Sequence, residues 1–122
     1  EPEILRLANV QHLATRVTGK LDDQGPSVLE LVDMLHPTAA VGGVPSQAAL
    51  ARIREVEGDL RGRYAGPVGW VDADGNGEWG IALRCALVSA DRARLFAGAG
   101  VMAGSFPEAE LEETRRAVRL RR

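Results

Sequence analysis

The segment from Phe96 to Thr114, which reads FAGAGVMAGSFPEAELEET, places the tightest constraint on how this chain folds. It joins an apolar strand pattern, a glycine-rich turn and a helix pattern. In the helix, Glu110 and Glu113 are three residues apart and project from the same side, where two carboxylates can bind one hard divalent cation such as Mg²⁺. In the turn, Gly98 and Gly100 leave backbone amides open to an anion. The alternative interpretation is that the two glutamates are simply solvated.

Local signals predict three helices. The capping-box spacing of Ser27 and Glu30 marks the start of the first, and Gly58 is expected to end the second or to lie near its end. The first helix is expected after Ser27, and the second from Pro45 and Ser46 to Gly58. The third is expected to begin at a second capping-box pair, Ser105 and Glu108, with Pro107 in its first turn, and to end at about Leu120.

Strand patterns fill the rest of the chain. Apolar residues alternate with polar ones in the N-terminal part, and three further strands are expected beyond the second helix. Their ranges are 5–21, 64–71, 79–88 and 94–101. The predicted fold class is therefore α+β, an antiparallel sheet with helices in the order β-α-α-β-β-β-α, as a single unit over residues 1–122.

The segment from Asp72 to Glu78 has two interpretations. It begins like an EF-hand calcium loop, but the twelfth position is Leu83, where a bidentate acid is required. The flanking residues also alternate as strands do. We therefore predict a hairpin turn rather than a calcium site.

Composition limits the function classes. The chain has 122 residues, a net charge of −2 and one cysteine, so a globular domain without an internal disulfide is expected. This charge argues against nucleic-acid binding, although the C-terminal end is rich in arginine. No apolar run reaches the length of a membrane span, and the first residues do not form a signal peptide, so a cytoplasmic protein is expected.

Two polar residues stand in strand patterns and need an explanation. Arg84 lies among apolar neighbours, where a guanidinium requires an anion, either a ligand or a structural carboxylate. His12 faces away from Leu13 and Val17, and is either exposed or part of a cleft.

Four segments, in this order, resemble the chorismate-utilising enzymes. Besides the C-terminal segment described first, they are NVQHLATRVTG (9–19), LHPTAAVGGVP (35–45) and RYAGPVGWVDADGNGEWGIALRCALV (63–88). The resemblance implies the C-terminal portion of a chorismate-binding domain, with the fold of that family.

The same resemblance implies roles for individual residues. Backbone amides at Gly98 and Gly100 would contact a carboxylate of chorismate. Arg84 and Tyr64 would bind the enolpyruvyl carboxylate, and Ala40 would also contact the substrate. His12 would border the active site as a catalytic residue, a donor near the substrate ring. Of the two acids on the last helix, Glu113 would bind Mg²⁺ directly, and Glu110 either directly or through a water molecule.

Within the family, the chain is most similar to isochorismate synthases of menaquinone or siderophore pathways. Ala40 stands where salicylate-forming relatives tend to have threonine, and the run from Ala39 to Pro45 differs from that of anthranilate synthases. The implied reaction is the magnesium-dependent isomerisation of chorismate to isochorismate. An anthranilate or salicylate synthase is the first alternative, and a noncatalytic anion- or partner-binding module is the second.

The sequence also departs from the family pattern. The catalytic base, the acid and a further metal-binding glutamate belong to regions upstream of those matched here, and Ala117 replaces the usual lysine. We therefore expect a fragment, a truncated product or a relative without the catalytic half, inactive alone. The apolar surface against which the missing part of the fold would pack would then be exposed and would favour self-association.

Overall fold

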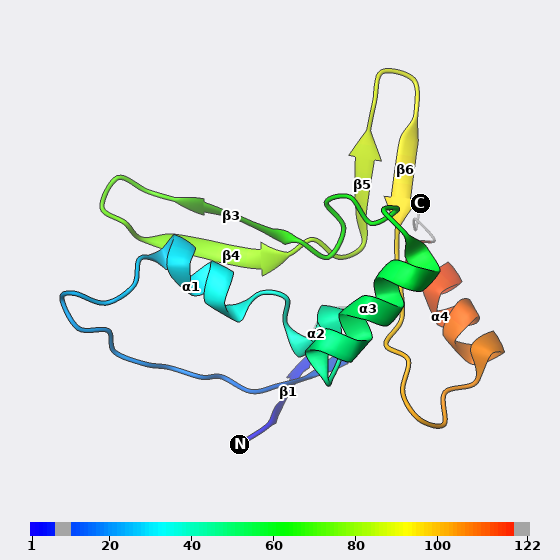
Figure 1. Cartoon of the computed structure of the whole chain (residues 1–122), viewed down its shortest axis with the longest axis horizontal. Helices are drawn as coiled ribbons and strands as arrows, with labels where there is room; N and C mark the ends of the chain where they lie inside the picture. Colours follow the sequence, from blue (N-terminus) through cyan, green and yellow to red (C-terminus); the bar gives the residue numbers. More distant parts are fainter. Residues whose placement is uncertain (7–10, 119–122) are drawn as a thin grey trace.

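The computed structural model describes residues 1–6 and 11–118, and within them not the side chain of His12. This part of the chain is α+β, as predicted (Figure 1). Its elements, in order, are β1 (Glu3–Arg6), β2 (Gln11–Ala14), α1 (Val28–Leu35), α2 (Ala39–Gly42), α3 (Ser46–Glu57), β3 (Pro67–Val71), β4 (Gly77–Ile81), β5 (Cys85–Val88), β6 (Ala93–Phe96) and α4 (Pro107–Val118).

The predicted long strand at residues 5–21 is wrong. Instead β1 and β2 pair as antiparallel strands, with Leu5 opposite His12, and residues 15–27 form neither helix nor strand. Alternation of apolar and polar residues predicts a strand when one face is covered. Here Leu13 and Val17 remain exposed, so the alternation corresponds to no buried face.

The predicted strand at residues 79–88 is two strands. The strand is interrupted at Arg84, whose φ is +48°. Just before it, Leu83 N donates to Ile81 O at 2.7 Å. As a result β4 pairs with β3, whereas β5 pairs with β6. No glycine or proline marks this break, because the glycine of the range, Gly80, lies inside β4.

Helix starts follow local signals with one exception. Ser27 caps α1 in a complete capping box with Glu30, and α3 ends at Gly58, both as predicted. Pro107 begins α4, but Ser105 does not cap it, because its Oγ accepts from Met102 N at 3.1 Å. The predicted end at Leu120 lies outside the described residues, and α2 lies outside the three predicted helices. Among described residues, no helix combines the length and apolar character that crossing a bilayer requires.

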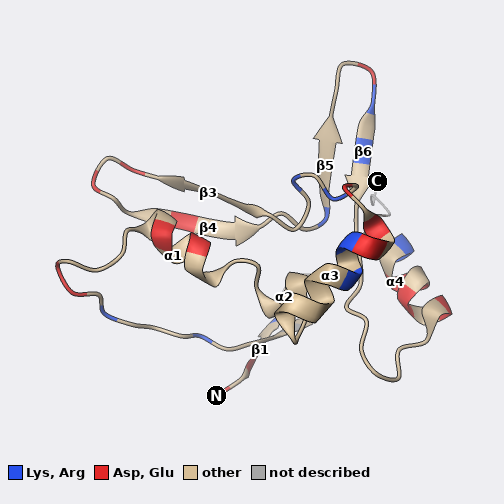
Figure 2. Cartoon of the chain, in the orientation of Figure 1, with Lys and Arg blue, Asp and Glu red and all other residues tan. Residues whose placement is uncertain are grey.

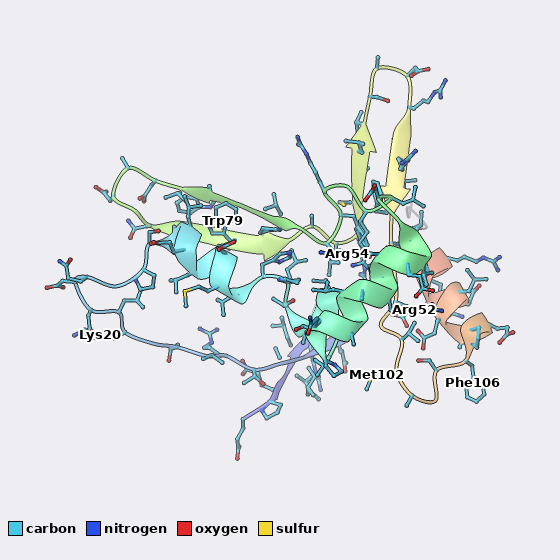
Figure 3. The ribbon with its side chains drawn as sticks, viewed as in Figure 1. Lys20, Arg52, Arg54, Trp79, Met102 and Phe106 are labelled. Atoms are coloured by element: carbon cyan, nitrogen blue, oxygen red, sulfur yellow. The ribbon has the colours of Figure 1, made fainter. Side chains whose placement is uncertain are left out.

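The strands form three separate antiparallel hairpins rather than the single sheet predicted. Figure 1 shows the β3–β4 and β5–β6 hairpins extending in different directions. The β3–β4 turn confirms the hairpin interpretation, since Asp72 Oδ1 accepts from the amides of Asp74 (3.0 Å) and Asn76 (2.8 Å). Trp79, labelled in Figure 3, pairs opposite Gly69, where a Cβ would come within 2.6 Å of the indole. Gly69 thus leaves room for this ring.

Few side chains are buried. Ala65, 6% exposed, is the one buried apolar side chain among the described residues. The accessible surface is 10928 Å², against about 6,300 Å² for a compact monomer of this mass. Charged residues mark α4 and the end of α3, with both signs on each (Figure 2). The elements are therefore held by local contacts, without a common apolar core.

Candidate functional site

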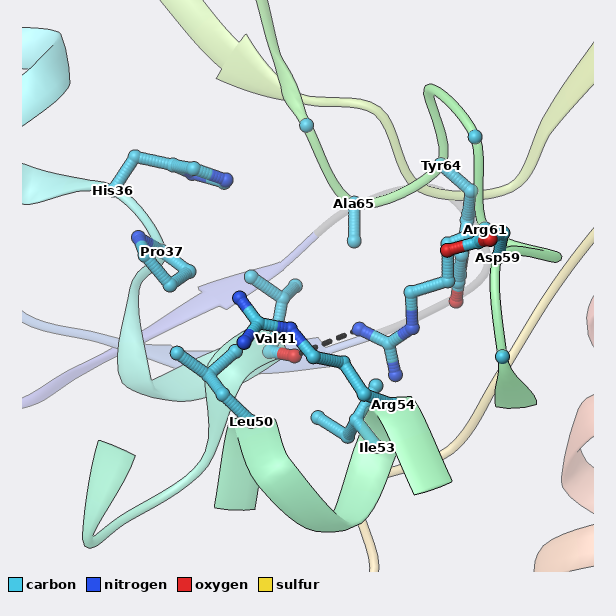
Figure 4. A pocket seen from close by; sticks show the side chains of 13 residues that line it. His36, Pro37, Val41, Leu50, Ile53, Arg54, Asp59, Arg61, Tyr64 and Ala65 are labelled. Atoms are coloured by element: carbon cyan, nitrogen blue, oxygen red, sulfur yellow. Dashed lines mark hydrogen bonds between the residues drawn. The ribbon is translucent and has the colours of Figure 1, made fainter. Parts of the chain in front are cut away.

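Arg61 lies where three hollows meet. It belongs to the turns that follow α3, after Gly58 has ended that helix. The first hollow, shown in Figure 4, lies between α2, α3 and the turn before β3. We refer to the three hollows together as the Arg61 cleft. The first is lined by His36, Pro37, Val41, Leu50, Ile53, Arg54, Asp59, Arg61, Tyr64 and Ala65, among others; the second by Glu57, Leu60, Arg61, Tyr64, Arg94, Phe96 and Ala97.

The guanidinium of Arg61 is held by two different groups. Its Nε and Nη2 donate to the two carboxylate oxygens of Glu57 at 2.6 and 2.8 Å, and Nη1 donates to the Val41 carbonyl at 3.0 Å. The hydrogen bonds from Arg61 lower the pKa of Glu57 and those from Glu57 raise the pKa of Arg61. Both groups therefore remain charged over the physiological pH range, and the pair connects α2 to the end of α3.

Tyr64 contacts both this pair and β6. Its ring stacks on Phe96 with centroids 5.7 Å apart, and the Arg61 guanidinium carbon lies 5.9 Å from the tyrosine centroid. Partial burial raises the pKa of the Tyr64 phenol, while the charge of Arg61 acts in the opposite direction. A Cβ on Gly98 would lie 2.8 Å from the Tyr64 oxygen. The structure therefore brings together two of the predicted substrate-binding residues.

Ala40 and Gly100 also lie together. Both line the third hollow, of about 770 Å³, between the α2–α3 pair and the turn after β6. Arg52 and Arg61 contribute positive charge to this hollow, and Glu57 contributes negative charge. Nothing lies within 4 Å of a Cβ built on Gly100, so its backbone is open to an approaching ligand. Three of the predicted residues, Ala40, Tyr64 and Gly100, thus line the Arg61 cleft, and Gly98 lies against Tyr64.

Arg84 is not placed as its neighbours suggested. It is exposed and stands at the bend between β4 and β5, not within a buried strand. It takes part in none of the ion pairs between described residues, and it is not among the residues that line the three hollows. Contrary to what its neighbours in sequence predicted, burial therefore does not force Arg84 to have an anion, because water reaches the guanidinium.

The two acids predicted to bind metal lie on α4. Glu110 is half-buried and Glu113 is exposed. In the part of the chain that the structure describes, no three acidic, histidine or cysteine side chains gather as a metal site. Mg²⁺ keeps several waters and often takes only one or two protein carboxylates together with substrate oxygens, so this pair fits as part of its ligand set.

The backbone of His12, the predicted catalytic residue, lies in β2 opposite Leu5. The structure does not describe its side chain.

Three residues at the centre of the site were not predicted from the sequence: Glu57, Arg61 and Phe96. For the first two a signal was present, because a glutamate followed four residues later by an arginine is the favourable helical ion-pair spacing. The contact of Phe96 with Tyr64 joins residues far apart in sequence and left no local pattern.

Comparison with known proteins identifies the family. The model of the chorismate binding enzyme family matches residues 1–119. This chain therefore belongs to the chorismate-binding enzymes.

Curated relatives are isochorismate synthases by name. The chain is 51% identical over 116 residues to a Mycobacterium tuberculosis protein provisionally named isochorismate synthase MenF, covering 93% of this chain and 31% of that protein. It is 50% identical to the salicylate biosynthesis isochorismate synthase of Pseudomonas aeruginosa and 44% identical to isochorismate synthase MenF of Bacillus subtilis, in each case covering 93% of this chain and 24% of the relative. The chain thus spans less than a third of the length of these relatives. No solved structure matches the chain.

Proposed function

We propose that this chain contributes the C-terminal portion of the chorismate-binding domain to an isochorismate synthase, acting in menaquinone or siderophore biosynthesis in the cytoplasm. The observation that carries the proposal is the identity of 44–51% to proteins named isochorismate synthases over 93% of the chain. The position of Ala40, Tyr64 and Gly100 in the lining of the Arg61 cleft supports it, because these residues were expected to contact the substrate. Gly98, also expected to contact the substrate, lies against Tyr64.

In this proposal the chain binds and orients chorismate. Tyr64 and Arg84 contact the enolpyruvyl carboxylate, and the exposed position of Arg84 leaves its planar fork free for such a ligand. The open backbone at Gly100, with that at Gly98, donates to a carboxylate. His12 supplies a polar group near the ring. Orientation of the ring for attack by water is the chain's contribution to the rate.

Glu110 and Glu113 would hold Mg²⁺ on the same side of α4. The bound ion would neutralise the negative charge of the ring carboxylate. Two carboxylates leave the remaining positions of an octahedral ion to water and substrate oxygens.

The groups that activate water and protonate the leaving hydroxyl are not assigned in this chain. We therefore expect the isolated chain to be inactive, and activity to require the remaining two thirds or more that its relatives possess. Self-association of the isolated chain is part of the same proposal, because its apolar side chains are largely exposed.

A chimera tests the proposal. This chain replaces the aligned segment of the Bacillus subtilis relative, and the purified chimera is incubated with chorismate and Mg²⁺ before the products are separated by chromatography. Isochorismate as the product is expected. A chimera carrying Glu113→Ala serves as the matched control and should lose most of the activity.

Other products would contradict the assignment. Anthranilate with ammonia, or salicylate with release of pyruvate, would identify a different chorismate enzyme. A chimera that shows the circular dichroism of the parent relative but leaves chorismate unchanged would favour a noncatalytic binding module.

A further inference from the structure

We propose that Arg61 is a positioning residue whose guanidinium holds the Tyr64 ring in the cleft by linking it to Glu57 and to the Val41 carbonyl. The inference rests on the proposed function, in which Tyr64 contacts the substrate carboxylate. It assigns to Arg61 a role that its position in a turn does not suggest.

The first step is the rigidity of the guanidinium. Two of its N–H groups donate to both oxygens of Glu57, at 2.6 and 2.8 Å. A third donates to Val41 O at 3.0 Å, the dashed line in Figure 4. A bidentate pair fixes the plane of the fork, and the third bond fixes it relative to α2. The arginine side chain is 27% exposed, so water competes only partly for these donors.

The second step is the connection from this fork to the tyrosine. Tyr64 N donates to Arg61 O at 2.8 Å, which closes the turn between the two residues. The guanidinium carbon lies 5.9 Å from the Tyr64 centroid, within the range of a cation–π contact. Phe96 also lies against this ring. The phenol therefore ends beside Gly98 because Arg61 and Phe96 hold the ring.

The third step separates positioning from direct binding. Glu57 already neutralises the charge of Arg61, and three of its five donors are engaged. Because its charge is already neutralised and only two of its N–H groups are left, this guanidinium attracts a further carboxylate weakly. Arg61 therefore acts on substrate through Tyr64.

Tyr64 makes a direct test possible, because it is the single tyrosine of the chain. The ultraviolet absorbance of tyrosinate during an alkaline titration of the full chain reports this phenol alone. The charged or titratable groups that act on it are Arg61, Glu57 and Cys85. Burial raises its pKa above the usual value of about 10.0, and the positive charge of Arg61 lowers it.

The two possible roles of Arg61 predict opposite results for Arg61→Gln. If Arg61 holds the ring in place, its loss releases the phenol to water and the pKa of Tyr64 falls toward 10.0. If Arg61 acts only as a nearby charge, its loss raises that pKa or leaves it unchanged, which would overturn the proposal. Arg92→Gln is the matched control, because Arg92 is 84% exposed and pairs with Asp91 in the β5–β6 turn. It should leave the titration unaltered.

Arg61→Lys keeps the charge but not the fork, and it decides the question if circular dichroism shows that Arg61→Gln has lost its helices. Release of the ring again lowers the pKa of Tyr64 toward its usual value, whereas a role through charge alone leaves it where it is.

Kinetics of the chimera give the second readout. We expect Arg61→Gln to raise KM for chorismate about tenfold to a hundredfold through misplacement of Tyr64. In a chimera that already carries Tyr64→Phe, the further substitution Arg61→Gln should raise KM much less. An additive effect of the two substitutions would overturn the proposal. If the unsubstituted chimera makes no isochorismate while Arg61→Gln lowers the tyrosine pKa, the proposed function fails and the positioning role stands.

Discussion

The phenol of Tyr64 occupies the space that a side chain on Gly98 would need. A Cβ at Gly98 would lie 2.8 Å from the phenol oxygen and 3.8 Å from the ring carbon that bears it. Real Cβ atoms do not approach other atoms so closely, so one of the two residues must move if the glycine is replaced. The end of a side chain moves more easily than the backbone, so the tyrosine should yield.

Gly98→Ala should therefore displace Tyr64 and weaken chorismate binding about tenfold in the chimera, with little loss of helix content. Isothermal titration calorimetry measures the affinity, and the tyrosinate titration reports the displacement. Gly100→Ala is the control for the displacement, because nothing lies within 4 Å of that Cβ. An unchanged Tyr64 pKa in Gly98→Ala would show that the contact does not constrain the ring.

The Glu57–Arg61 pair should make the end of α3 sensitive to acid. Hydrogen bonds from Arg61 hold the pKa of Glu57 below its usual value of about 4.5. A lowered pKa in the folded state means that the pair stabilises the fold fully above pH 4.5 or so, and that this stabilisation is lost as pH falls through the lower, folded-state value. Denaturation midpoints of the chain and of Glu57→Gln, followed by circular dichroism, should thus differ near neutral pH and converge in acid. A difference that persists in acid would indicate a cause other than ionisation.

Arg84 provides a test of substrate binding that is separate from stability. Because its side chain is exposed, Arg84→Gln should change the free energy of unfolding by less than about 0.5 kcal/mol. In the proposed role, the same substitution lowers chorismate affinity about tenfold or more, and Arg84→Lys recovers only part of it, since lysine lacks the planar fork. Calorimetry on the chimera measures both variants. Equal affinity for Arg84→Gln and the parent would remove Arg84 from the site.

Signals contained in a few neighbouring residues predicted the structure well. The capping box of Ser27 and Glu30, the turn at Asp72 and the place of Pro107 in the first turn of α4 were all predicted, because each depends on hydrogen bonds or backbone limits within about one turn. The second capping box, at Ser105, was not confirmed. Strand extent was predicted poorly. Nothing between residues 79 and 88 indicates that the backbone turns at Arg84, since the conformation with positive φ is imposed by the pairing of β4 and β5 with different partners.

In the candidate site, too, local features were predicted and contacts between distant residues were not. Individual residues such as Tyr64 and Gly98 were predicted from resemblance, but their mutual contact was not. Burial was the weakest inference: Arg84 stands among apolar residues that themselves remain exposed, so apolar neighbours in sequence did not mean a dry environment. The sequence contains the Glu57–Arg61 spacing, yet only the structure shows that the same arginine reaches Val41 and Tyr64.

The metal site predicts a difference between acids on one helix. Glu113→Ala and Glu110→Ala should each lower the Mg²⁺ affinity of the chimera at least about tenfold, because even partners that only support a ligand contribute that much. Glu108→Ala is the matched control, an exposed acid in the first turn of the same helix. Titration of activity with Mg²⁺ gives the affinities. If the Mg²⁺ affinity of all three variants equals that of the unsubstituted chimera, α4 is excluded as the metal site.

The exposed apolar surface predicts that the isolated chain associates. The accessible surface exceeds that of a compact monomer by about 4,600 Å², as large as the area buried in obligate interfaces. Phe106, which is 74% exposed at the start of α4 (Figure 3), belongs to this surface. Sedimentation velocity at increasing concentration should show growing species, and Phe106→Ser should shift the distribution toward monomer, whereas Arg92→Gln should not. Sedimentation as a compact monomer at high concentration would contradict the prediction, because the chain would then have to bury its apolar side chains within itself.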